Sequence, residues 1–427
     1  MDILSFINDK LWLFTTLLIF LFGLYFSFKL KWIQFNIIKM ISSLLKKDNC
    51  NEGVTSFKTL MLSLAGRIGV GSISGVALAI YLGGPGTVFW IWVISFISAS
   101  IAYSEAYLAV KYKVRIVDGF IGGPSYYIKR GINKLFLGGV YSIIITLCYV
   151  IGFIGIQANT ITKSFNGLLF NISPYLIGSI ISILTLFIIF GGIKKITETT
   201  SKIVPIMSIF YIVLSLYITL SNIGIFPNII KSIFTSAFNF KSFSSGFLVT
   251  LLIGVQRGIF SNEAGIGTGA IASASSSSDD ANKQGYIQII GVYITSIIIC
   301  TCTAFIILSS SYKGLNVIDP NGIEIATFSF NYHLGKFGNI FLLISIFLFA
   351  FSTILSGYFY GESSLKYFFN NINNKYIFIL KLLTTIVIFT GSIISSTFIW
   401  NFIDILVSIL AIINIYAIYK LRNEIKR

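Results

Sequence analysis

Long apolar stretches recur along the chain and are separated by short polar or basic segments. A helix needs about 20 mostly apolar residues to cross the hydrocarbon core of a bilayer. The stretches near that length are 10–28, 59–81, 87–110, 136–162, 174–191, 203–221, 246–275, 284–309, 337–361, 376–395 and 397–419. They are too uniformly apolar for barrel strands, which would alternate over about 10 residues. The pattern therefore predicts an all-α polytopic membrane protein with eleven transmembrane helices in a single domain, residues 1–427.

The composition supports this prediction. Of the 427 residues, 55% are hydrophobic and only 11% are charged, whereas soluble domains carry about 25% charged residues. So little polar material cannot cover a soluble globule, which excludes an ordinary cytosolic enzyme. The formal net charge is nonetheless +16. A basic face can attract nucleic acid, so the positions of the basic residues decide what this charge means.

The basic residues concentrate in alternate loops between the predicted spans. If loop 29–58 faces the cytoplasm, the loops on that side and the C-terminal tail hold 23 of the 31 Lys and Arg residues, the opposite loops hold six, and two lie within spans. Cytoplasmic loops carry such an excess. We therefore expect an outside N-terminus and a cytoplasmic C-terminus, and the charge requires no nucleic-acid partner. Within 29–47, basic and apolar residues interleave, which fits either an interfacial helix or a solvated loop.

Two predicted spans contain glycine-rich breaks. Segments 65–75 and 256–269 hold four glycines each, and each glycine costs a helix about 1 kcal/mol relative to alanine. The second segment also carries Arg257, Asn262 and Glu263. Unwound backbone at membrane depth is tolerated only where it is buried in protein or lines a cavity, and ionisable groups there mark function. The alternative is close packing of helices through small residues.

The two breaks are placed alike in the chain. Without the first span, ten spans remain, and each break opens one group of five. Because five is odd, the groups 59–221 and 246–420 have opposite topology, while 1–58 adds an N-terminal helix and a basic interfacial segment. Glycine-interrupted helices at matching positions of two inverted halves indicate a transporter with its site at the midplane. Half-helix N-termini can hold a substrate carboxylate, and freed carbonyls can coordinate Na⁺.

Other polar residues interrupt the apolar pattern singly or in pairs. Segment 349–357 places Ser352 beside Thr353, whose hydroxyls offer neutral oxygens to a monovalent cation or bond to the preceding helical turn. Glu105 lies near the cytoplasmic end of its span, and we expect it to pair with a basic loop residue. Arg67 is expected to pair with either Glu263 or Asp404, a choice that the sequence leaves open.

The broken segments resemble the alanine/glycine:cation symporter family. The resemblance rests on Arg67–Ala77 with Gly83–Trp90, Arg257–Gly267 with Lys283–Gly285, and Phe349–Leu355 with Tyr360–Glu362. It implies a leucine-transporter-like fold, in which a five-plus-five inverted repeat is joined by one extra N-terminal helix. It also implies import of a small neutral amino acid, alanine or glycine, by symport with Na⁺, or with H⁺ in some members.

The resemblance further implies site residues. Those expected to bind substrate are Gly69, Gly71, Ser72, Gln157, Phe260, Asn262, Gly265 and Gly267. The family usually has Asn at the position of Ser72, so this pocket departs from the family pattern. Those expected to hold Na⁺ are the carbonyls of Ala65, Ile68 and Phe349 and the hydroxyls of Ser352 and Thr353. The charges expected to act as gates are Arg67, Arg257 and Glu263.

Two other classes of protein fit the sequence less well. A membrane enzyme would need a catalytic cluster at membrane depth, but the single histidine, His333, falls outside the predicted spans. A channel usually needs a filter repeated in an oligomer, whereas paired halves in one chain favour alternating access. We therefore expect no enzymatic activity, no cofactor apart from Na⁺ as coupling ion, and a multi-pass protein of a bacterial cytoplasmic membrane. The sequence leaves open the preferred amino acid, Na⁺ against H⁺, and the oligomeric state.

Overall fold

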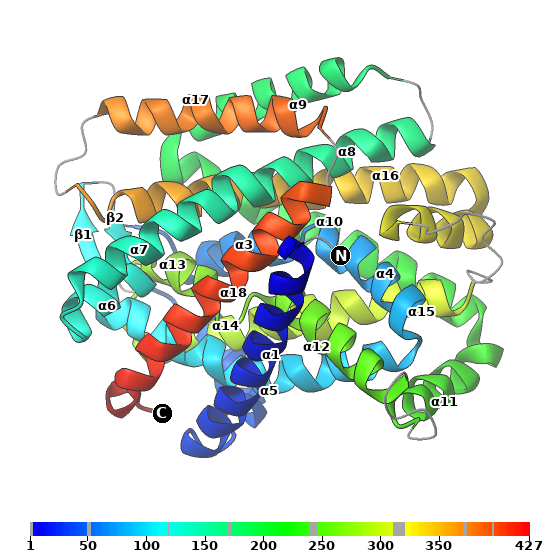
Figure 1. Cartoon of the computed structure of the whole chain (residues 1–427), viewed down its shortest axis with the longest axis horizontal. Coiled ribbons are helices and arrows are strands. Elements are labelled where there is room, and N and C mark those ends of the chain that lie inside the picture. Colours follow the sequence, from blue (N-terminus) through cyan, green and yellow to red (C-terminus); the bar gives the residue numbers. More distant parts are fainter. Residues whose placement is uncertain are drawn as a thin grey trace.

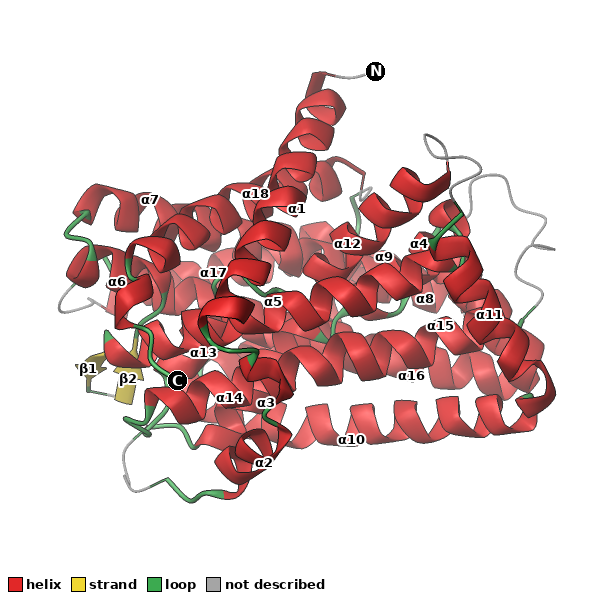
Figure 2. Cartoon of the chain, turned by 90° about the horizontal axis from the view of Figure 1, so that it is seen from below, coloured by secondary structure: helices red, strands yellow, loops and turns green. Residues whose placement is uncertain are grey.

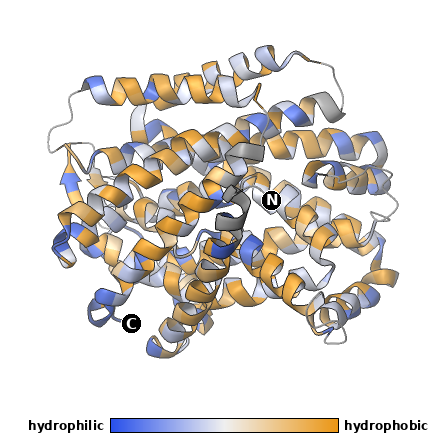
Figure 3. Ribbon diagram, viewed as in Figure 1, coloured by the Kyte–Doolittle hydropathy of each residue, from blue (hydrophilic) through white to orange (hydrophobic). Residues whose placement is uncertain are grey.

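The computed structural model describes residues 3–48, 53–117, 119–168, 172–239, 246–310, 321–369, 374–394 and 397–427. Most of this part is helical, and Figure 1 shows long helices packed side by side. The helices are predominantly apolar, and hydrophilic residues gather at helix ends and in loops (Figure 3). The strand pair in the described part is a short antiparallel ribbon of β1 (Val114–Ile116) and β2 (Gly119–Ile121).

The long helices overlap the predicted apolar stretches, whereas shorter helices at 37–45, 124–131 and 226–237 lie in segments predicted as loops. The first group is α1 (Ile3–Lys29), α2 (Ile37–Leu45), α3 (Ser56–Arg67), α4 (Ser74–Gly83), α5 (Gly86–Lys111), α6 (Pro124–Gly131), α7 (Leu135–Thr146), α8 (Ile154–Leu168), α9 (Pro174–Ile189) and α10 (Gly192–Ser221). The second is α11 (Phe226–Ala237), α12 (Leu248–Asn262), α13 (Thr268–Ala274), α14 (Ala281–Val292), α15 (Cys300–Leu308), α16 (Gly322–Leu365), α17 (Asn374–Gly391) and α18 (Thr397–Lys420). Short π-helical turns, η3 (Leu147–Phe153) and η7 (Tyr293–Ile299), join α7 to α8 and α14 to α15.

The polytopic character of the chain is confirmed, whereas the number of spans stays a prediction. Seven helices in the described part are long and apolar enough to cross a membrane, and the bent pair α3–α4 makes up to eight. Helix α9 has 16 residues, and α12 and α13 have 15 and 7. These elements overlap predicted spans but are individually short of the length that a bilayer requires.

The chain breaks where the first glycine-rich segment predicts. Helix α3 ends at Arg67, a single tight turn covers Val70–Ser72, and α4 begins at Ser74. The two arms of this broken span are bent by 66° relative to each other. The predicted interruption is therefore confirmed, and it leaves backbone groups of this segment without helical partners.

The second break is also confirmed. Helix α12 ends at Asn262 and α13 begins at Thr268. Between them, Glu263, Gly265 and Gly267 have φ of 52°, 90° and 107°. Glycine adopts such angles freely, whereas a glutamate there is uncommon and strained. The two glycines therefore allow the chain to leave the helical path between α12 and α13, and the environment must hold Glu263 in place.

The third interruption, at 349–357, does not break the backbone. Helix α16 runs continuously through Ser352 and Thr353, and both hydroxyls donate to the carbonyl of Phe349 one turn earlier, at 2.9 Å. The non-helical kink of α16 lies instead at Gly335, with φ of 58°. His333, which the sequence placed in a loop, is part of this helix, because α16 begins at Gly322, well before the predicted span.

Helix α5 lies at the centre of the fold and positions the second break. It packs against α12, α13 and α14, and nearly all of its second half is buried. Helix α16 packs against α3, α4 and α8 and faces the first break. The extra helix α1 packs against α5 and α18 on the outside of this core (Figure 1). The two breaks are thus enclosed by long, continuous helices.

Basic segments predicted to be cytoplasmic meet at one end of the molecule. Lys111 forms an ion pair with Glu424 at 2.7 Å, and Lys46 forms one with Asp280 at 3.3 Å. The C-terminus lies beside α14 at this end, whereas the first turn of α1 lies at the opposite end of the molecule (Figure 2). Helix α2 also lies here and exposes an apolar face that includes Ile38, so part of the basic segment 29–47 is helical as one of the two interpretations expected.

Candidate substrate and cation site

The first break faces α8 and α16 at very short range. A Cβ atom at Gly69 would lie 2.8 Å from the hydroxyl of Thr353 and 3.1 Å from Nε2 of Gln157. The freed N–H of Val70 donates to Oε1 of Gln157 at 3.3 Å. The absence of a side chain at Gly69 therefore lets α16 and α8 approach the unwound backbone, and Gln157 satisfies part of it.

An aromatic side chain from the second break covers Gly71. A Cβ atom at Gly71 would lie 3.2 Å from the ring of Phe260. That ring stacks on Phe153 with centroids 5.3 Å apart and contacts Trp400 at 5.6 Å. The π-helical turn η3 carries Phe153, and such turns are frequent at functional sites. The space beside Gly71 is consequently small and walled by aromatic rings.

Ser72 belongs to a buried polar group that the sequence did not predict. Its hydroxyl lies 3.4 Å from the carbonyl of Arg67 and 3.5 Å from the hydroxyl of Ser261. Ser261 in turn lies 3.1 Å from Sγ of Cys300, and Thr303 donates to the carbonyl of Ser72 at 2.9 Å. The polar residues Cys300 and Thr303 within an apolar span were the signal that could have found this contact.

The structure does not bring the other predicted substrate residues to this group. Asn262 donates to the hydroxyls of Ser95 and Ser98 on α5, at 3.3 and 3.2 Å. The N–H of Gly265 donates to Glu105 at 3.2 Å. Tyr141 and Pro124 occupy the space that a side chain at Gly267 would need. Gly69, Gly71, Ser72, Gln157 and Phe260 therefore form one group. Asn262, Gly265 and Gly267 face α5, α6, α7 and α18.

Most of the predicted cation ligands meet where α3 ends against α16. The hydroxyl of Thr353 donates to the carbonyl of Ala65 at 2.8 Å and to that of Phe349 at 2.9 Å. Ser352 is fully buried, and its hydroxyl shares the carbonyl of Phe349. Ile68, the remaining predicted ligand, directly follows the last residue of α3. These neutral oxygens have the chemistry that a hard monovalent cation such as Na⁺ requires.

The charges beside the breaks are paired differently from the prediction. Within the described part of the chain, Arg67 forms no ion pair, and its Nη1 donates to the carbonyl of Gln288 at 3.4 Å. Glu263 accepts hydrogen bonds from Tyr149 at 2.8 Å and Thr268 at 2.7 Å. The expectation that Glu105 pairs with a basic loop residue is wrong. Its carboxylate is fully buried and binds the N–H of Gly265 and the side chain of Asn414, which α18 brings next to α5.

A cavity of about 300 Å³ is lined in part by Trp400, which also contacts Phe260. The polar side chains that line it are Ser74, Asn159, Thr160, Lys163, Arg257, Asn321 and Asp404. It therefore joins Arg257 with Asp404, the acidic residue considered as a partner of Arg67. Its lining is therefore largely polar, unlike the aromatic surroundings of Gly71.

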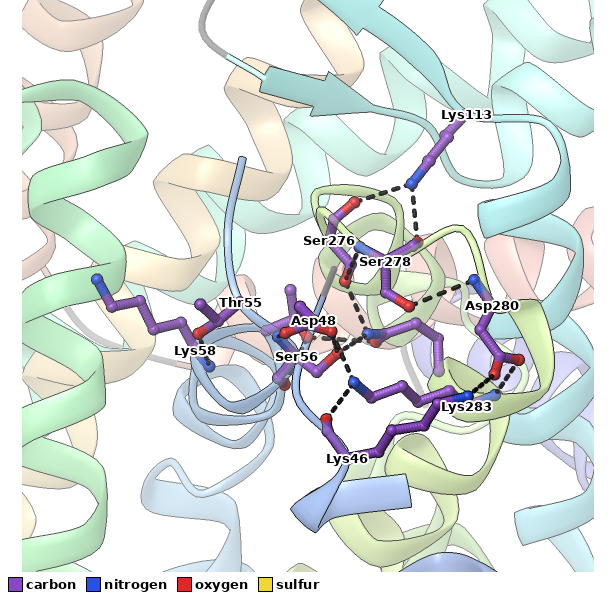
Figure 4. Close-up of polar contacts among 12 residues, drawn as sticks. Lys46, Asp48, Thr55, Ser56, Lys58, Lys113, Ser276, Ser278, Asp280 and Lys283 are labelled. Carbon is purple, nitrogen blue, oxygen red and sulfur yellow. Dashed lines mark hydrogen bonds and ion pairs between the residues drawn. The ribbon is translucent and has the colours of Figure 1, made fainter. Parts of the chain in front are cut away.

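At the basic end, buried polar contacts hold α3 to the loop between α13 and α14 (Figure 4). Nζ of Lys283 lies 2.7 Å from Oδ1 of Asp48, and these side chains are only 2% and 9% exposed. Asp48 also accepts hydrogen bonds from the N–H and the hydroxyl of Ser56, both at 2.7 Å. Ser56 is the first residue of α3, so Asp48 and Lys283 fix the beginning of the broken span.

The backbone strengthens the same connection. Val54 pairs in parallel with Ser276: its N–H donates to Ser275 at 3.2 Å, and its carbonyl accepts from Ser277 at 2.8 Å. Gln284 donates to the hydroxyls of Ser56 and Ser276 at 2.7 and 2.8 Å. We call the contacts of Asp48, Val54 and Ser56 with Ser275–Ser277, Lys283 and Gln284 the latch.

The latch is insensitive to pH near neutrality. Burial alone would raise the pKa of Asp48, but the ion pair with Lys283 and the hydrogen bonds from Ser56 outweigh burial and hold this pKa below its ordinary value of 3.8. The stabilisation is therefore fully present above that ordinary value and is lost only as the pH falls through the lowered pKa. Neutral and mildly acidic solutions leave Asp48 ionised.

Two broken helices beside buried polar groups are typical of secondary transporters. Solved structures agree with this fold. The crystal structure of MhsT in complex with L-phenylalanine matches with a TM-score of 0.62 and 14% identity, over 87% of this chain and 90% of that chain. A Na⁺-coupled sialic acid symporter in a substrate-bound outward-open state matches with a TM-score of 0.55 and 16% identity, over 95% of this chain and 82% of that chain. Both likenesses show the leucine-transporter-like fold.

The family is shown by the sequence comparison. The model of the sodium:alanine symporter family matches residues 1–427, and the chain belongs to this family. It is 36% identical to the amino-acid carrier protein AlsT of Bacillus subtilis, over 97% of this chain and 88% of the relative. It is 32% identical to the sodium/alanine symporter AgcS of Methanococcus maripaludis, over 94% and 90%. The protein is thus a multi-pass membrane symporter of the sodium-coupled amino acid class and not an enzyme.

Proposed function

We propose that this protein imports alanine or glycine together with Na⁺, by alternating access around the gap between α3 and α4. The observation that carries the proposal is the meeting of Gly69 with Gln157 and Thr353. One unwound segment thereby contacts both the proposed substrate group and the proposed cation ligands. Binding of the cation would order the same backbone that binds the amino acid, which is the requirement for coupling.

The chemistry of the gap supports a small neutral substrate. Gly69, Gly71, Ser72, Gln157 and Phe260 include no ionisable side chain, so the charges of a zwitterion would meet backbone dipoles and the cation. Phe260 closes the space beside Gly71 at van der Waals distance, which leaves little room for a large side chain. Relatives support the amino acid class, although their names differ: one is a probable sodium/glutamine symporter of Bacillus subtilis.

Alternating access would proceed between the two ends of the gap. The cavity with Arg257 and Asp404 would be the outer entrance, which Phe260 and Trp400 close, and the latch would be the inner closure. Arg67 and Glu263, beside the breaks, would change partners as the arms of the broken helices move. In this proposal the N-terminus lies outside and the C-terminus lies in the cytoplasm, and 59–221 and 246–420 are inverted repeats.

The test is uptake of labelled alanine into proteoliposomes with and without an inward Na⁺ gradient. Saturable uptake that requires the gradient supports the proposal, whereas a conductance without such a requirement would indicate a channel. Replacement of the Na⁺ gradient by a proton gradient tests the second candidate, H⁺-coupled transport. That candidate is favoured by a relative named as a putative sodium/proton-dependent alanine carrier, to which the chain is 35% identical.

A competition series of unlabelled amino acids would then define the substrate. We expect glycine and alanine to compete best in the wild type. The variant Ser72→Asn restores the usual residue of the family and places a longer amide beside Ser261. We expect the order of competitors to change in this variant, and an unchanged order would remove Ser72 from the substrate shell.

A further inference from the structure

Three ionisable groups lie buried together beside the second break. Arg67 at the end of α3, Glu105 on α5 and Glu263 after α12 are 2%, 0% and 1% exposed. Both Glu105 and Glu263 interact electrostatically with Arg67. The group therefore contains two acids and one base inside a membrane protein, where an unbalanced charge is strongly unfavourable.

Glu263 has the contacts of an ionised carboxylate. One of its oxygens accepts a hydrogen bond from the hydroxyl of Tyr149 and the other accepts one from the hydroxyl of Thr268, at 2.8 and 2.7 Å. A carboxylate that accepts a hydrogen bond on both oxygens is stabilised in its charged form. Glu263 and Arg67 together then balance each other's charge.

Glu105 has a different environment. Its Oε2 accepts from the N–H of Gly265 and from Asn414, at 3.2 and 2.9 Å, while its Oε1 is buried without a hydrogen-bond partner. A Cβ atom at Gly269 would lie 3.3 Å from this Oε1 and in contact with Nη2 of Arg67. Glu105 and Arg67 therefore both lie against Gly269, but they form no ion pair among the described residues. An ionised Glu105 would leave the group with a net negative charge.

Other groups around Glu105 do not supply the missing positive charge. Its charged neighbours in the described part of the chain are Arg67 and Glu263. The hydroxyls of Tyr127 on α6, Tyr141 on α7 and Tyr360 on α16 also interact electrostatically with Glu105. Tyrosine is neutral near pH 7. Asn414 on α18 is a donor without charge.

We propose that Glu105 is a proton-binding site of this transporter, occupied in the arrangement seen here and separate from the coupling cation. The proton comes from the surrounding water and converts the carboxylate to a neutral carboxylic acid, which leaves Arg67 and Glu263 as a balanced pair. Because Oε2 binds the N–H of Gly265, and Asn414 binds both Glu105 and the carbonyl of Gly265 at 2.9 Å, the proton is linked to the second break. Loss of the proton would draw Arg67 toward Glu105 and disturb that segment.

The first test is infrared spectroscopy of the purified protein in nanodiscs, with pH titration in heavy water. We expect the stretching band of a protonated carboxyl group near neutral pH, and its loss in Glu105→Gln. The matched variant Asp404→Asn, whose carboxyl lies near Arg257 and not in this group, should retain the band. A wild-type protein without a protonated carboxyl near neutral pH would overturn the proposal, and so would a band that survives in Glu105→Gln but disappears in Asp404→Asn.

The second test concerns transport and rests on the proposed function. In proteoliposomes with a fixed Na⁺ gradient, we expect wild-type alanine uptake to fall as the pH is raised through the titration seen by infrared. Glu105→Gln should lose this alkaline fall, whereas Glu424→Gln, at the exposed end of the chain, should keep it. An unchanged fall in Glu105→Gln would overturn the link to transport. A wild type without Na⁺-driven uptake would instead contradict the proposed function, because the infrared result does not depend on it.

Discussion

One added methyl group tests the contact on which the proposed coupling depends. Gly69 is the residue at which the unwound backbone meets Thr353 and Gln157, and a Cβ atom there would approach both within 3.1 Å. We expect Gly69→Ala to reduce Na⁺-driven alanine uptake more than tenfold, because either α16 or Gln157 must move away. The control is Gly75→Ala in the same segment, where the nearest atom to an added Cβ is 4.0 Å away. Equal effects of the two substitutions would contradict this assignment.

The hydroxyl of Thr353 is expected to contribute to Na⁺ binding and not directly to substrate binding. Thr353→Val preserves the shape of the side chain and removes the hydroxyl that lies between the carbonyls of Ala65 and Phe349. Loss of a buried ligand or hydrogen bond costs about 1 to 3 kcal/mol, so we expect the Na⁺ concentration for half-maximal uptake to rise about tenfold or more.

The matched control for this substitution is Thr390→Val on α17, where the hydroxyl is exposed and bonds to carbonyls of the preceding turn, the nearest at 2.8 Å. We expect that variant to keep the wild-type dependence on Na⁺. Thr353 would be excluded as a cation ligand if its substitution changed only the apparent affinity for alanine.

At the level of single residues, the sequence could identify Gly69, Gly71 and Thr353 because glycines and hydroxyls are rare features in apolar spans. It could not predict that Ser261 contacts Ser72, or that Glu105 binds the backbone of Gly265. Those contacts join segments more than 150 residues apart and depend on how α5 packs against α12 and α13. A buried carboxyl also looks the same in sequence whether it pairs with lysine or with backbone.

At the level of elements, the glycine-rich breaks could be predicted because clustered glycines remove the tendency to continue a helix. The continuity of α16 through Ser352 is one of two alternatives that the sequence leaves open, since these hydroxyls find carbonyl partners within their own helix and need no break. The π-helical turns η3 and η7 have no sequence signal, because both consist largely of ordinary apolar residues. They arise from packing against neighbouring helices.

The latch provides a prediction about the movement of α3. Val54 and Ser276 pair directly across the connection, so a disulfide between cysteines at these positions should form with little distortion. In a variant without the four native cysteines, we expect oxidation of Val54→Cys/Ser276→Cys to abolish uptake and reduction to restore it. The reason is that α3 could no longer separate from the loop after α13. Cys50, one of the native cysteines, lies outside the described residues.

Each single substitution, Val54→Cys or Ser276→Cys, is the control and should keep uptake under oxidation. Binding of alanine from the outer side should survive in the oxidised double variant, because the cavity with Arg257 and Asp404 lies elsewhere. Full uptake by the cross-linked protein would show that the latch stays closed during transport. The inner closure would then have to be sought in another part of the molecule.

At the level of the whole molecule, the distribution of charge predicts the orientation in the membrane. The exposed Lys231 on α11 belongs to the sparsely charged side, and the exposed Lys47 belongs to the basic end that includes the latch. We expect a membrane-impermeant thiol reagent to label Lys231→Cys in intact cells, and to label Lys47→Cys only after the membrane is opened. Both measurements use the background without native cysteines.

The side of the membrane on which the basic end lies determines the direction of transport. If Lys47 is cytoplasmic, the latch closes the inner end, and the cavity with Arg257 and Asp404 opens to the outside, as import requires. If only Lys47→Cys were labelled in intact cells, the orientation in the membrane would be the opposite of the predicted one. The cavity would then open to the cytoplasm. The excess of basic residues would then have a cause other than topology. If the labelling places the basic end in the cytoplasm and an inward Na⁺ gradient drives uptake, the same orientation explains both results. The net charge of +16 would then reflect the cytoplasmic loops of an importer.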